Sequence, residues 1–331
     1  MNKQHKEDQW KPISGLKIAK ERAIKLEKIR NFFKKENVLE VDTPILSKSA
    51  TSDINIESIS ASLSDNSSST NFLHTSPELY MKRLLADGFK DIYQICKVFR
   101  GSELGSNHLP EFTMIEWYRM GFNLKEIIKN TIELISMILN NSHPSIQTDT
   151  ISYQDAFKEY LNIDPINDDI NKISSIINPE ESLAKEFNKN QCLDFLLSTK
   201  ITKEFHTKKL TVLHHYPASQ AALARICPDD KRFSDRFEIF LGDLELANGY
   251  VELTDADEIK QRFSDDQLYR EEHGLKIRPL DSNFINAMEH GLPGCAGVAL
   301  GFDRLLMISE GEGNIEKVQQ FSPFTNQKKH A

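Results

Sequence analysis

The fold is decided by residues 99–118, which read FRGSELGSNHLPEFTMIEWY. This stretch begins at the end of an apolar, aromatic-rich run, residues 91–100, and ends inside a second such run, residues 111–119. The segment between the two runs is polar and contains two glycines and Pro110, residue types that interrupt regular structure. The pattern predicts a β-hairpin with a long loop, a kind of loop that often carries functional side chains.

Arg100 and Phe112 stand where the two strands meet this loop. An arginine at a strand end can present its planar guanidinium to a phosphate or a carboxylate, and an aromatic ring across the hairpin can stack on a base. A lone arginine at a strand end is more often part of a surface ion pair, so the hairpin alone does not decide the function.

Two upstream segments have clear starts and stops. Residues 17–36 carry apolar side chains at helical spacing, which predicts an amphipathic helix, and residues 38–43 predict a strand that ends at Pro44. Residues 74–85 read HTSPELYMKRLL. They predict the end of a short strand followed by a helix whose first residues combine a cap, a first-turn proline and an acid: Ser76, Pro77 and Glu78.

A further acidic segment, residues 245–253, reads ELANGYVEL. In a regular strand Glu245 and Glu252 point to opposite faces, but Asn248-Gly249 permits a bulge that resets the alternation. Two glutamates and an asparagine brought together in this way could hold magnesium beside a triphosphate or bind a cationic substrate. Taken alone, the segment fits better as a hairpin turn at Asn-Gly with solvated acids on either side.

Residues 297–304 read GVALGFDR. Small residues let a strand backbone approach a ligand closely, and Arg304 then falls in the first turn of a following helix. The glycine spacing and the charged exit do not match a dinucleotide-binding fingerprint. Close packing of a strand against a helix would explain the small residues of this segment equally well.

The remaining segments predict an α+β fold. Further strands are expected over 210–216, 237–253 and 296–301, and further helices over 124–140, 254–273 and 302–310. Residues 150–210 read as mostly helical and polar, and residues 60–71 as a low-complexity turn. Helical insertions without regular βαβ alternation favour a largely antiparallel sheet. We expect one domain over residues 1–331, with a flexible tail over 311–331.

Composition narrows the classes of function. Of the 331 residues 39% are hydrophobic, enough for a large core, and acids outnumber bases by 49 to 41, which gives a net charge of −8. This charge disfavours a protein whose main role is to wrap nucleic acid. Four dispersed cysteines, a polar N-terminus and the lack of a membrane-length apolar run indicate a soluble cytoplasmic protein. His214-His215, and His290 with Cys295, lack zinc-ligand spacing.

These segments occur in the order of the class II aminoacyl-tRNA synthetase core, and the chain resembles the lysyl branch of that family. The helix and strand ending at Pro44 resemble motif 1, residues 99–118 motif 2 and residues 297–304 motif 3, while 74–85 and 245–253 resemble segments of the lysyl branch. The resemblance implies a mainly antiparallel sheet of six to seven strands flanked by helices. It also implies activation of an amino acid with ATP and Mg²⁺, and a homodimer formed through the motif 1 helix.

The resemblance implies roles for single residues. Arg100 would contact the α-phosphate and the substrate carboxylate, Arg304 and Phe112 would sandwich the adenine, and Glu245 and Glu252 would hold magnesium. Glu78 and Asn248 would receive the amino and carboxylate ends of the amino acid, and Glu116, Tyr118 and Glu252 its distal ammonium. Arg100 and Arg304 would be catalytic. The implied nucleotide-binding set is Arg100, Gly101, Ser102, Glu103, Leu109, Phe112, Glu245, Leu246, Gly301 and Arg304. The implied amino-acid set is Ser76, Pro77, Glu78, Glu116, Tyr118, Asn248, Glu252 and Ala299.

Within that branch the chain is similar to the elongation factor P–(R)-β-lysine ligase family. Only about fifteen residues precede the motif 1 helix, too few for the anticodon-binding barrel of the synthetases. Ala299 stands where the synthetases usually have glycine and the ligases alanine, which would favour β-lysine over α-lysine. The resemblance implies transfer of β-lysine or lysine to a lysine side chain of elongation factor P, with no tRNA and no membrane as a partner.

The sequence departs from the family pattern at two positions. Ser102 stands where the family has a glutamate that reads the adenine, with Glu103 beside it, and Leu109 replaces an asparagine. Two alternative functions stay open: a truncated ligase that forms lysyl adenylate for another acceptor, and a non-catalytic regulatory paralogue. The presence of Arg100 and Arg304 argues against the paralogue.

Overall fold

A computed structural model describes residues 10–63, 70–177 and 187–323. Its centre is an eight-stranded sheet in which every neighbouring pair is antiparallel except the two at the edges. From edge to edge the strands are β1 (Leu39–Glu40), β5 (Ile92–Phe99), β6 (Glu111–Met120), β11 (Cys295–Gly301), β10 (Leu244–Val251), β9 (Arg236–Leu241), β8 (Lys209–His214) and β7 (Gln147–Ser152).

The mainly antiparallel α+β sheet is confirmed, but it has eight strands where six to seven were expected. The strand missed by the sequence is β7, an edge strand that pairs in parallel with β8. None of its residues is fully buried, because an edge strand does not need an apolar face to pair on one side. The strand expected over residues 38–43 shrinks to the two residues of β1.

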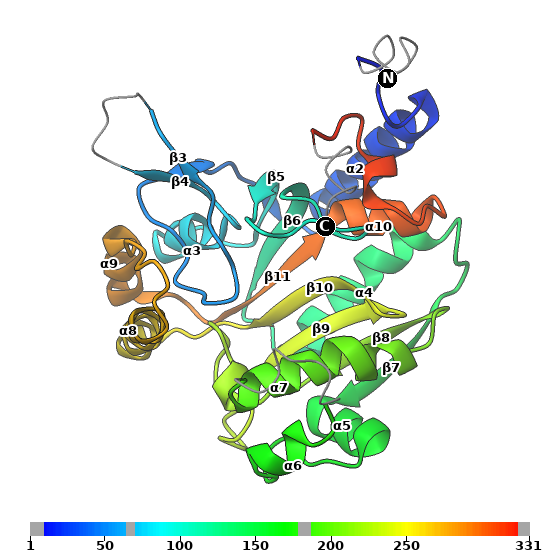
Figure 1. The fold of residues 1–331 in the computed structure, drawn as a ribbon. Coiled ribbons are helices and arrows are strands. Elements are labelled where there is room, and N and C mark those ends of the chain that lie inside the picture. The colour runs from blue at the N-terminus through cyan, green and yellow to red at the C-terminus, as the bar shows by residue number, and fades with distance from the viewer. Residues whose placement is uncertain (1–9, 64–69, 178–186, 324–331) are drawn as a thin grey trace, which may run out of the picture.

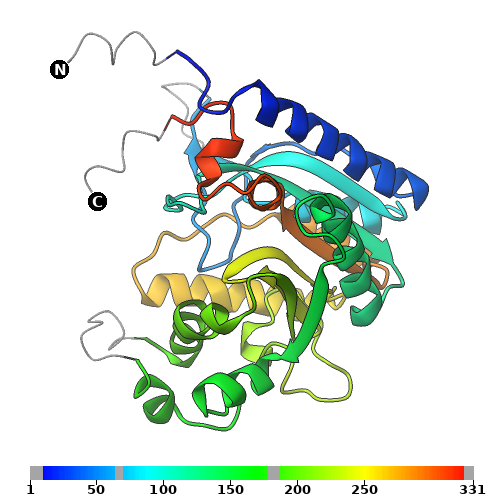
Figure 2. The ribbon, with the colours of Figure 1, turned by 90° about the vertical axis from the view of Figure 1, so that its right-hand side faces the viewer.

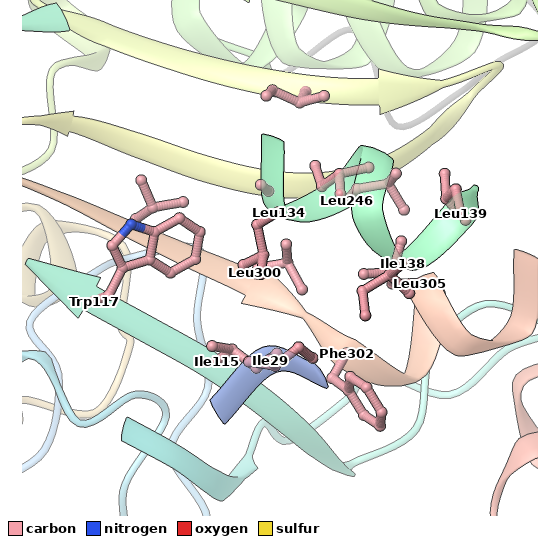
Figure 3. Close-up of a cluster of buried hydrophobic side chains, with 14 of the residues drawn as sticks. Ile29, Ile115, Trp117, Leu134, Ile138, Leu139, Leu246, Leu300, Phe302 and Leu305 are labelled. Atoms are coloured by element: carbon pink, nitrogen blue, oxygen red, sulfur yellow. The ribbon is translucent and has the colours of Figure 1, made fainter. Parts of the chain in front are cut away.

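Three helices cover one face of the sheet: α2 (Leu16–Lys35), α4 (Leu124–Leu139) and α10 (Phe302–Ser309) (Figures 1 and 2). The strands turn one row of alternating side chains toward these helices. Trp117 from β6, Leu300 from β11 and Leu246 from β10 meet Leu134 of α4 in the resulting core (Figure 3). The expected helices over 17–36, 124–140 and 302–310 are confirmed within one residue at either end.

The region 150–210 forms a second, smaller core, which packs against β7, β8 and β9 through Ile151, Leu213 and Phe240. It contains α5 (Tyr153–Leu161), α6 (Ile170–Ser174) and α7 (Lys189–Leu196), followed by a π-helical turn (Leu197–Ile201) and a 3₁₀ turn (Thr202–Glu204). Tyr153 and Phe157 stack at 4.7 Å inside this core. Its helical character was predicted, although the expected break at residues 178–179 lies outside the described residues.

A third group of helices stands over the opposite face of the sheet: α3 (Glu78–Ala86), α8 (Ala256–Glu272) and α9 (Ser282–Gly291) (Figure 1). Met81 of α3, Phe263 of α8 and Phe284 of α9 share one buried cluster. A small sheet of β2 (Leu46–Ser47), β4 (Asn71–Leu73) and β3 (Ser60–Ala61) lies nearby. Most of the low-complexity stretch, residues 64–69, lies outside the described residues. A cleft lies on this face of the sheet and is lined in part by α3 and α8.

The expected flexible tail differs from the structure over residues 311–323. A 3₁₀ turn (Ile315–Val318) buries Ile315 and Val318 in the main core, and the Ile315 N–H donates to the Ser106 carbonyl at 2.9 Å. These two apolar side chains anchor the segment, which the Lys/Asn/Gln-rich composition around them conceals. Residues 324–331 lie outside the described part of the chain. Within that part, no helix combines the length and the apolar character needed to cross a bilayer.

Asp303, at the start of α10, connects three of the motif-like segments. One carboxylate oxygen accepts a hydrogen bond from Arg22 of α2 at 2.5 Å, and the other accepts from the backbone N–H of Thr113 in β6 at 2.8 Å. Only 1% of the Asp303 side chain is exposed. The carboxylate therefore fixes the N-terminal helix, the long hairpin and α10 against one another.

We expect Asp303→Asn to destabilise the fold by about 3 kcal/mol, because a nearly buried guanidinium would lose its charge partner. Urea unfolding followed by circular dichroism measures this. Glu133→Gln, which removes the exposed pair between Glu133 and Lys129, should cost less than about 1 kcal/mol. Equal losses in the two variants would refute the role assigned to Asp303.

Candidate active site

The open face of the sheet carries one cleft of about 1020 Å³. Segments that are distant in the sequence converge on it: α3, the end of β5, β6, β10 and the junction of β11 with α10. Of the residues expected to bind nucleotide or amino acid, all but three line this cleft. The three that do not are Pro77, Gly101 and Ser102.

The backbone conformation keeps Gly101 and Ser102 out of the cleft lining. The Gly101 N–H donates to the Glu57 carbonyl at 2.7 Å, and a Cβ at Gly101 would lie 3.1 Å from the Glu57 side chain, so this residue packs against the loop 47–58. Ser102 has a φ of +64°, a left-handed conformation that redirects the chain. As a result Glu103 lines the cleft, with a carboxylate oxygen 3.8 Å from Arg100 Nη1.

Pro77 and Ser76 differ slightly from the expected helix start. Pro77 itself occupies the N-cap position of α3, while the Ser76 hydroxyl accepts a hydrogen bond from the Glu78 N–H at 3.3 Å. Ser76 and Glu78 therefore face the cleft and Pro77 does not. Glu78 stands in the first turn of the helix, where its negative charge is favoured by the helix dipole.

Strand alternation builds the floor of the cleft. Glu116 of β6 pairs with Ala299 of β11, which pairs in turn with Asn248 of β10. One pleat away, Tyr118 pairs with Gly297 and Gly297 with Tyr250. Cross-strand neighbours lie about 5 Å apart, so these two rows bring side chains from three strands into contact distance.

Strand β10 contains a bulge, but not at Asn248-Gly249, where the sequence permitted one. The β9–β10 register shifts between Glu245 and Ala247, so that Leu246 is the extra residue. Leu246 and Ala247 both belong to the main core, while Glu245 and Asn248 line the cleft. The hairpin turn falls between β9 and β10 at residues 242–243, and Asn248-Gly249 is regular strand. Both the hairpin turn and the bulge proposed at Asn-Gly were therefore wrong.

A lysine that sequence reasoning did not single out lies buried behind the end of the cleft lined by Glu78, Glu116 and Glu252, which we name the amino-acid end after the ligand expected there. Lys82, one turn after Glu78 in α3, is 1% exposed, and its Nζ lies 2.7 Å from Glu78 Oε1 and 2.6 Å from Glu252 Oε2. The Tyr250 hydroxyl donates to the same Glu78 oxygen at 2.5 Å. Burial by itself would lower the pKa of Lys82, but Glu252 and Glu78 raise it above its ordinary value.

Two carboxyl groups at this end are buried without enough cationic partners. Burial, together with the charge of Glu78, raises the pKa of Glu116 to about 8, and burial raises the pKa of Glu252 to about 8. Glu116 accepts a hydrogen bond from the Tyr118 hydroxyl at 2.7 Å through Oε1, while Oε2 has no partner among the described residues. Such groups form a site prepared for a cation.

Gly297 makes this arrangement sterically possible. A Cβ at position 297 would lie 2.4 Å from Glu252 Oε1 and 2.5 Å from the Tyr118 ring. The carboxylate and the ring thus occupy the space that any larger residue on β11 would fill.

The opposite end of the cleft is cationic and aromatic. The Arg100 guanidinium carbon lies 5.3 Å from the centre of the Phe112 ring, and its buried Nε has no hydrogen-bond partner in the described residues. Arg304 donates to the Glu245 carbonyl at 2.9 Å and to His108 Nε2 at 2.5 Å, which holds the hairpin loop against β10. Burial and the charge of Arg304 lower the pKa of His108, so this imidazole is a neutral acceptor.

The structure does not bring the two expected magnesium ligands together. Glu245 and Glu252 lie at opposite ends of β10, roughly 20 Å apart at the strand rise, too far for one ion. The acid that approaches Glu245 is Glu238 on β9, which also faces the cleft. Burial raises the pKa of Glu238 to about 7, the nearby Arg236 opposes this, and Glu245 adds to it. The donor set Glu238 and Glu245 fits magnesium at the triphosphate end.

Outside the cleft, a cluster of possible metal ligands includes His215, which the sequence analysis rejected as a zinc ligand. His215, Cys227 and Asp235 bring their ligand atoms within 4.8 Å of one another. Asp235 already accepts from Arg225 at 2.5 and 3.0 Å and from the Cys227 thiol at 3.1 Å. Burial and this hydrogen bond raise the pKa of Cys227 to about 12, so the thiol is protonated and the cluster is satisfied as it stands.

We expect Glu116→Gln to stabilise the ligand-free protein at pH 8 and to leave its stability unchanged at pH 5. A carboxyl whose pKa rises from 4.5 to about 8 on folding contributes stability below pH 4.5 and loses it as the pH rises through 8. The amide avoids that loss, so the melting temperature of the variant should exceed that of the wild type by a few degrees at pH 8 only. An equal difference at both pH values would contradict the assignment.

Comparison with known proteins agrees with this geometry. Residues 14–325 match the family model of class II tRNA synthetases (D, K and N). The chain is 42% identical to the elongation factor P–(R)-β-lysine ligase of Pseudoalteromonas translucida, over 94% of this chain and 97% of that protein. It is 41% identical to the same ligase of Avibacterium paragallinarum, over 96% and 98% of the two chains.

A third relative, the elongation factor P–(R)-β-lysine ligase of Mannheimia succiniciproducens, is 40% identical over 95% of this chain and 98% of its own. The matches run through both ends of the cleft and through the region 150–210. The chain is therefore a ligase of the class II tRNA-synthetase family, in the branch formed by the elongation factor P–(R)-β-lysine ligases.

Proposed function

We propose that the protein activates (R)-β-lysine, or lysine, with ATP as its aminoacyl adenylate and transfers it to a lysine side chain of elongation factor P. The observation that carries this proposal is the difference in charge between the two ends of the cleft. Buried carboxyl groups around Lys82 stand at one end, and Arg100 on the Phe112 ring stands at the other. A diamino acid and a nucleotide together have the matching charges. The names of the relatives point to the same reaction.

At the nucleotide end, Arg100 binds the α-phosphate through the guanidinium whose Nε lacks a partner within the described residues. Phe112 and Arg304 flank the base, and Glu103 takes over the adenine contact that Ser102 does not supply. Glu238 and Glu245 hold magnesium, which when bound neutralises charge on the triphosphate. Glu252, the second ligand first expected, instead belongs to the amino-acid end.

The reaction proceeds in two steps, an in-line displacement at phosphorus followed by an acyl transfer. A carboxylate oxygen of the amino acid attacks the α-phosphorus of ATP and the bond to pyrophosphate breaks, while Arg100 stabilises the charge that develops. The neutral amine of the acceptor lysine then attacks the adenylate carbonyl, an amide forms, AMP leaves, and the amine proton passes to solvent. Positioning of the reactants lowers the barrier in both steps, so no general base is assigned.

The proposal extends to assembly and location. The motif 1-like helix α2 and the strands that follow it carry exposed apolar side chains, which support a homodimer through α2: Ile24, Leu39 and Leu46. The protein would act in the cytoplasm, where ATP and elongation factor P are present, without tRNA.

Exchange of labelled pyrophosphate into ATP tests the first step. We expect exchange with β-lysine, less with α-lysine and none without an amino acid. Arg100→Ala should reduce the rate by a factor on the order of 100 or more, because it removes charge stabilisation at the reacting phosphorus. The exposed Arg30→Ala serves as the control and should be unaffected. Absence of exchange with both lysines would identify the regulatory paralogue instead.

Mass spectrometry of elongation factor P tests the second step. The factor, incubated with this protein, ATP and β-lysine, should gain the mass of one lysyl residue, and the gain should disappear with Arg100→Ala. An unmodified factor together with intact exchange would instead favour the ligase with a different acceptor.

Ala299→Gly tests the choice between α- and β-lysine. The Ala299 methyl group stands between Glu116 and Asn248 on the cleft floor, and one methyl group in a pocket changes discrimination by about tenfold. We expect the kcat/KM ratio of α-lysine to β-lysine to rise by about this factor. Ala296→Gly, on the core side of the same strand, should leave the ratio unchanged.

A further inference from the structure

We infer that Lys82 is the specificity-determining residue that sets the charge of the amino-acid end, so that this end accepts a substrate with two ammonium groups. The inference deepens the proposed function and rests on it for the identity of the reaction. Lys82 is a positioning residue, because it acts through two carboxylates that would contact the substrate.

The first step of the argument is the set of contacts that Lys82 makes. Its ammonium group is 1% exposed and joins Glu78 of α3 to Glu252 at the end of β10, at 2.7 and 2.6 Å. It also lies 5.4 Å from the centre of the Tyr250 ring. A buried ammonium between two carboxylates stays charged and orients both of them.

The second step is a charge balance. Three carboxyl groups, Glu78, Glu116 and Glu252, converge on this end, and Lys82 compensates one of them. Two negative charges remain when all three groups are ionised. A ligand with two ammonium groups restores neutrality, whereas a ligand with one ammonium group leaves a buried charge unpaired.

The third step concerns the carboxylate oxygens that have no hydrogen-bond donor among the described residues. Glu252 Oε1 and Glu116 Oε2 are buried and accept no hydrogen bond from any described residue, and both residues line the cleft. Glu252 Oε1 lies next to Gly297, which also lines the cleft. The oxygens that Lys82 leaves free are thus available to a ligand that enters the cleft.

A purely structural ion pair is the competing explanation, and the chain contains one for comparison. Lys25 of α2 is also buried, and its Nζ lies 3.0 Å from Glu21, four residues earlier, and 2.6 Å from the distant Glu310. The two lysines therefore have the same local arrangement, but Glu78 and Glu252 line the cleft, whereas Glu21 and Glu310 do not. Lys25→Met is a matched control for Lys82→Met.

The test combines calorimetric binding of β-lysine with pyrophosphate exchange, each measured from pH 6 to 9. Without Lys82, Glu252 should bind a proton more tightly and lose its affinity for an ammonium group. We expect Lys82→Met to raise the Kd and KM for β-lysine on the order of tenfold at pH 7, with recovery toward pH 9 and an unchanged KM for ATP. Lys82→Arg, which keeps the charge, should retain the wild-type pH profile.

Thermal unfolding confirms that each variant is folded, and Lys25→Met should lose stability without a change in Kd or pH profile. Wild-type Kd values and pH profile in Lys82→Met would overturn the inference, as would a Lys82→Arg variant that is folded yet behaves like Lys82→Met. Binding of β-lysine that depends on Lys82, without any exchange, would support the inference while removing the proposed reaction. A wild-type protein that binds no β-lysine would overturn both.

Discussion

The alternation of side chains along β6, β11, β10 and β9 is the constraint on which the rest of the structure depends. Each strand turns one row of side chains, such as Trp117 and Leu300, toward the helices and the other row, such as Glu116 and Ala299, toward the cleft. Because the period is two, a shift of one residue in any strand would exchange core and site. The bulge at Leu246 keeps both Glu245 and Asn248 on the cleft side of a single strand.

The site opposes the stability of the fold that carries it. Buried carboxyl groups with raised pKa values and unsatisfied oxygens destabilise the ligand-free molecule, since they have lost their water without gaining a partner for every oxygen. The cost is tolerated because these groups stand on a sheet whose other face is fully packed. The hydrogen bonds of Asp303 add rigidity by fixing α2, β6 and α10 together. Functional sites are where local rules of stability are commonly broken.

The local sequence was sufficient to predict the helices and strands with strong apolar periodicity. It was insufficient for elements that form only because they pair or pack with a distant segment. The hairpin of β5 and β6 and the helix α2 follow from apolar spacing. Strand β7 was missed because an exposed edge strand has no such pattern, and α9 was missed because its polar residues surround only two buried ones, Phe284 and Met288. The convergence of the motif-like segments on one cleft followed from the family resemblance and could not be derived from spacing.

Within the site, the errors concern residues whose role depends on a distant partner. A lysine in an amphipathic helix normally reads as solvated, and only Glu252, far along the chain, makes Lys82 a buried group. Its signals in the sequence were Glu78, four residues earlier, and the apolar residues Leu79 and Met81 that lie between the two. Likewise Glu238 was overlooked because its proximity to Glu245 arises from the pairing of two strands.

The packing around Gly297 limits how this protein can diversify. No β-carbon fits at position 297, so even the smallest substitution, to alanine, would displace both the Glu252 carboxylate and the Tyr118 ring. Position 299, two residues along the same strand and on the same face, already carries a methyl group. Laboratory evolution of new amino-acid substrates should therefore accumulate variation at the second position and leave the first invariant.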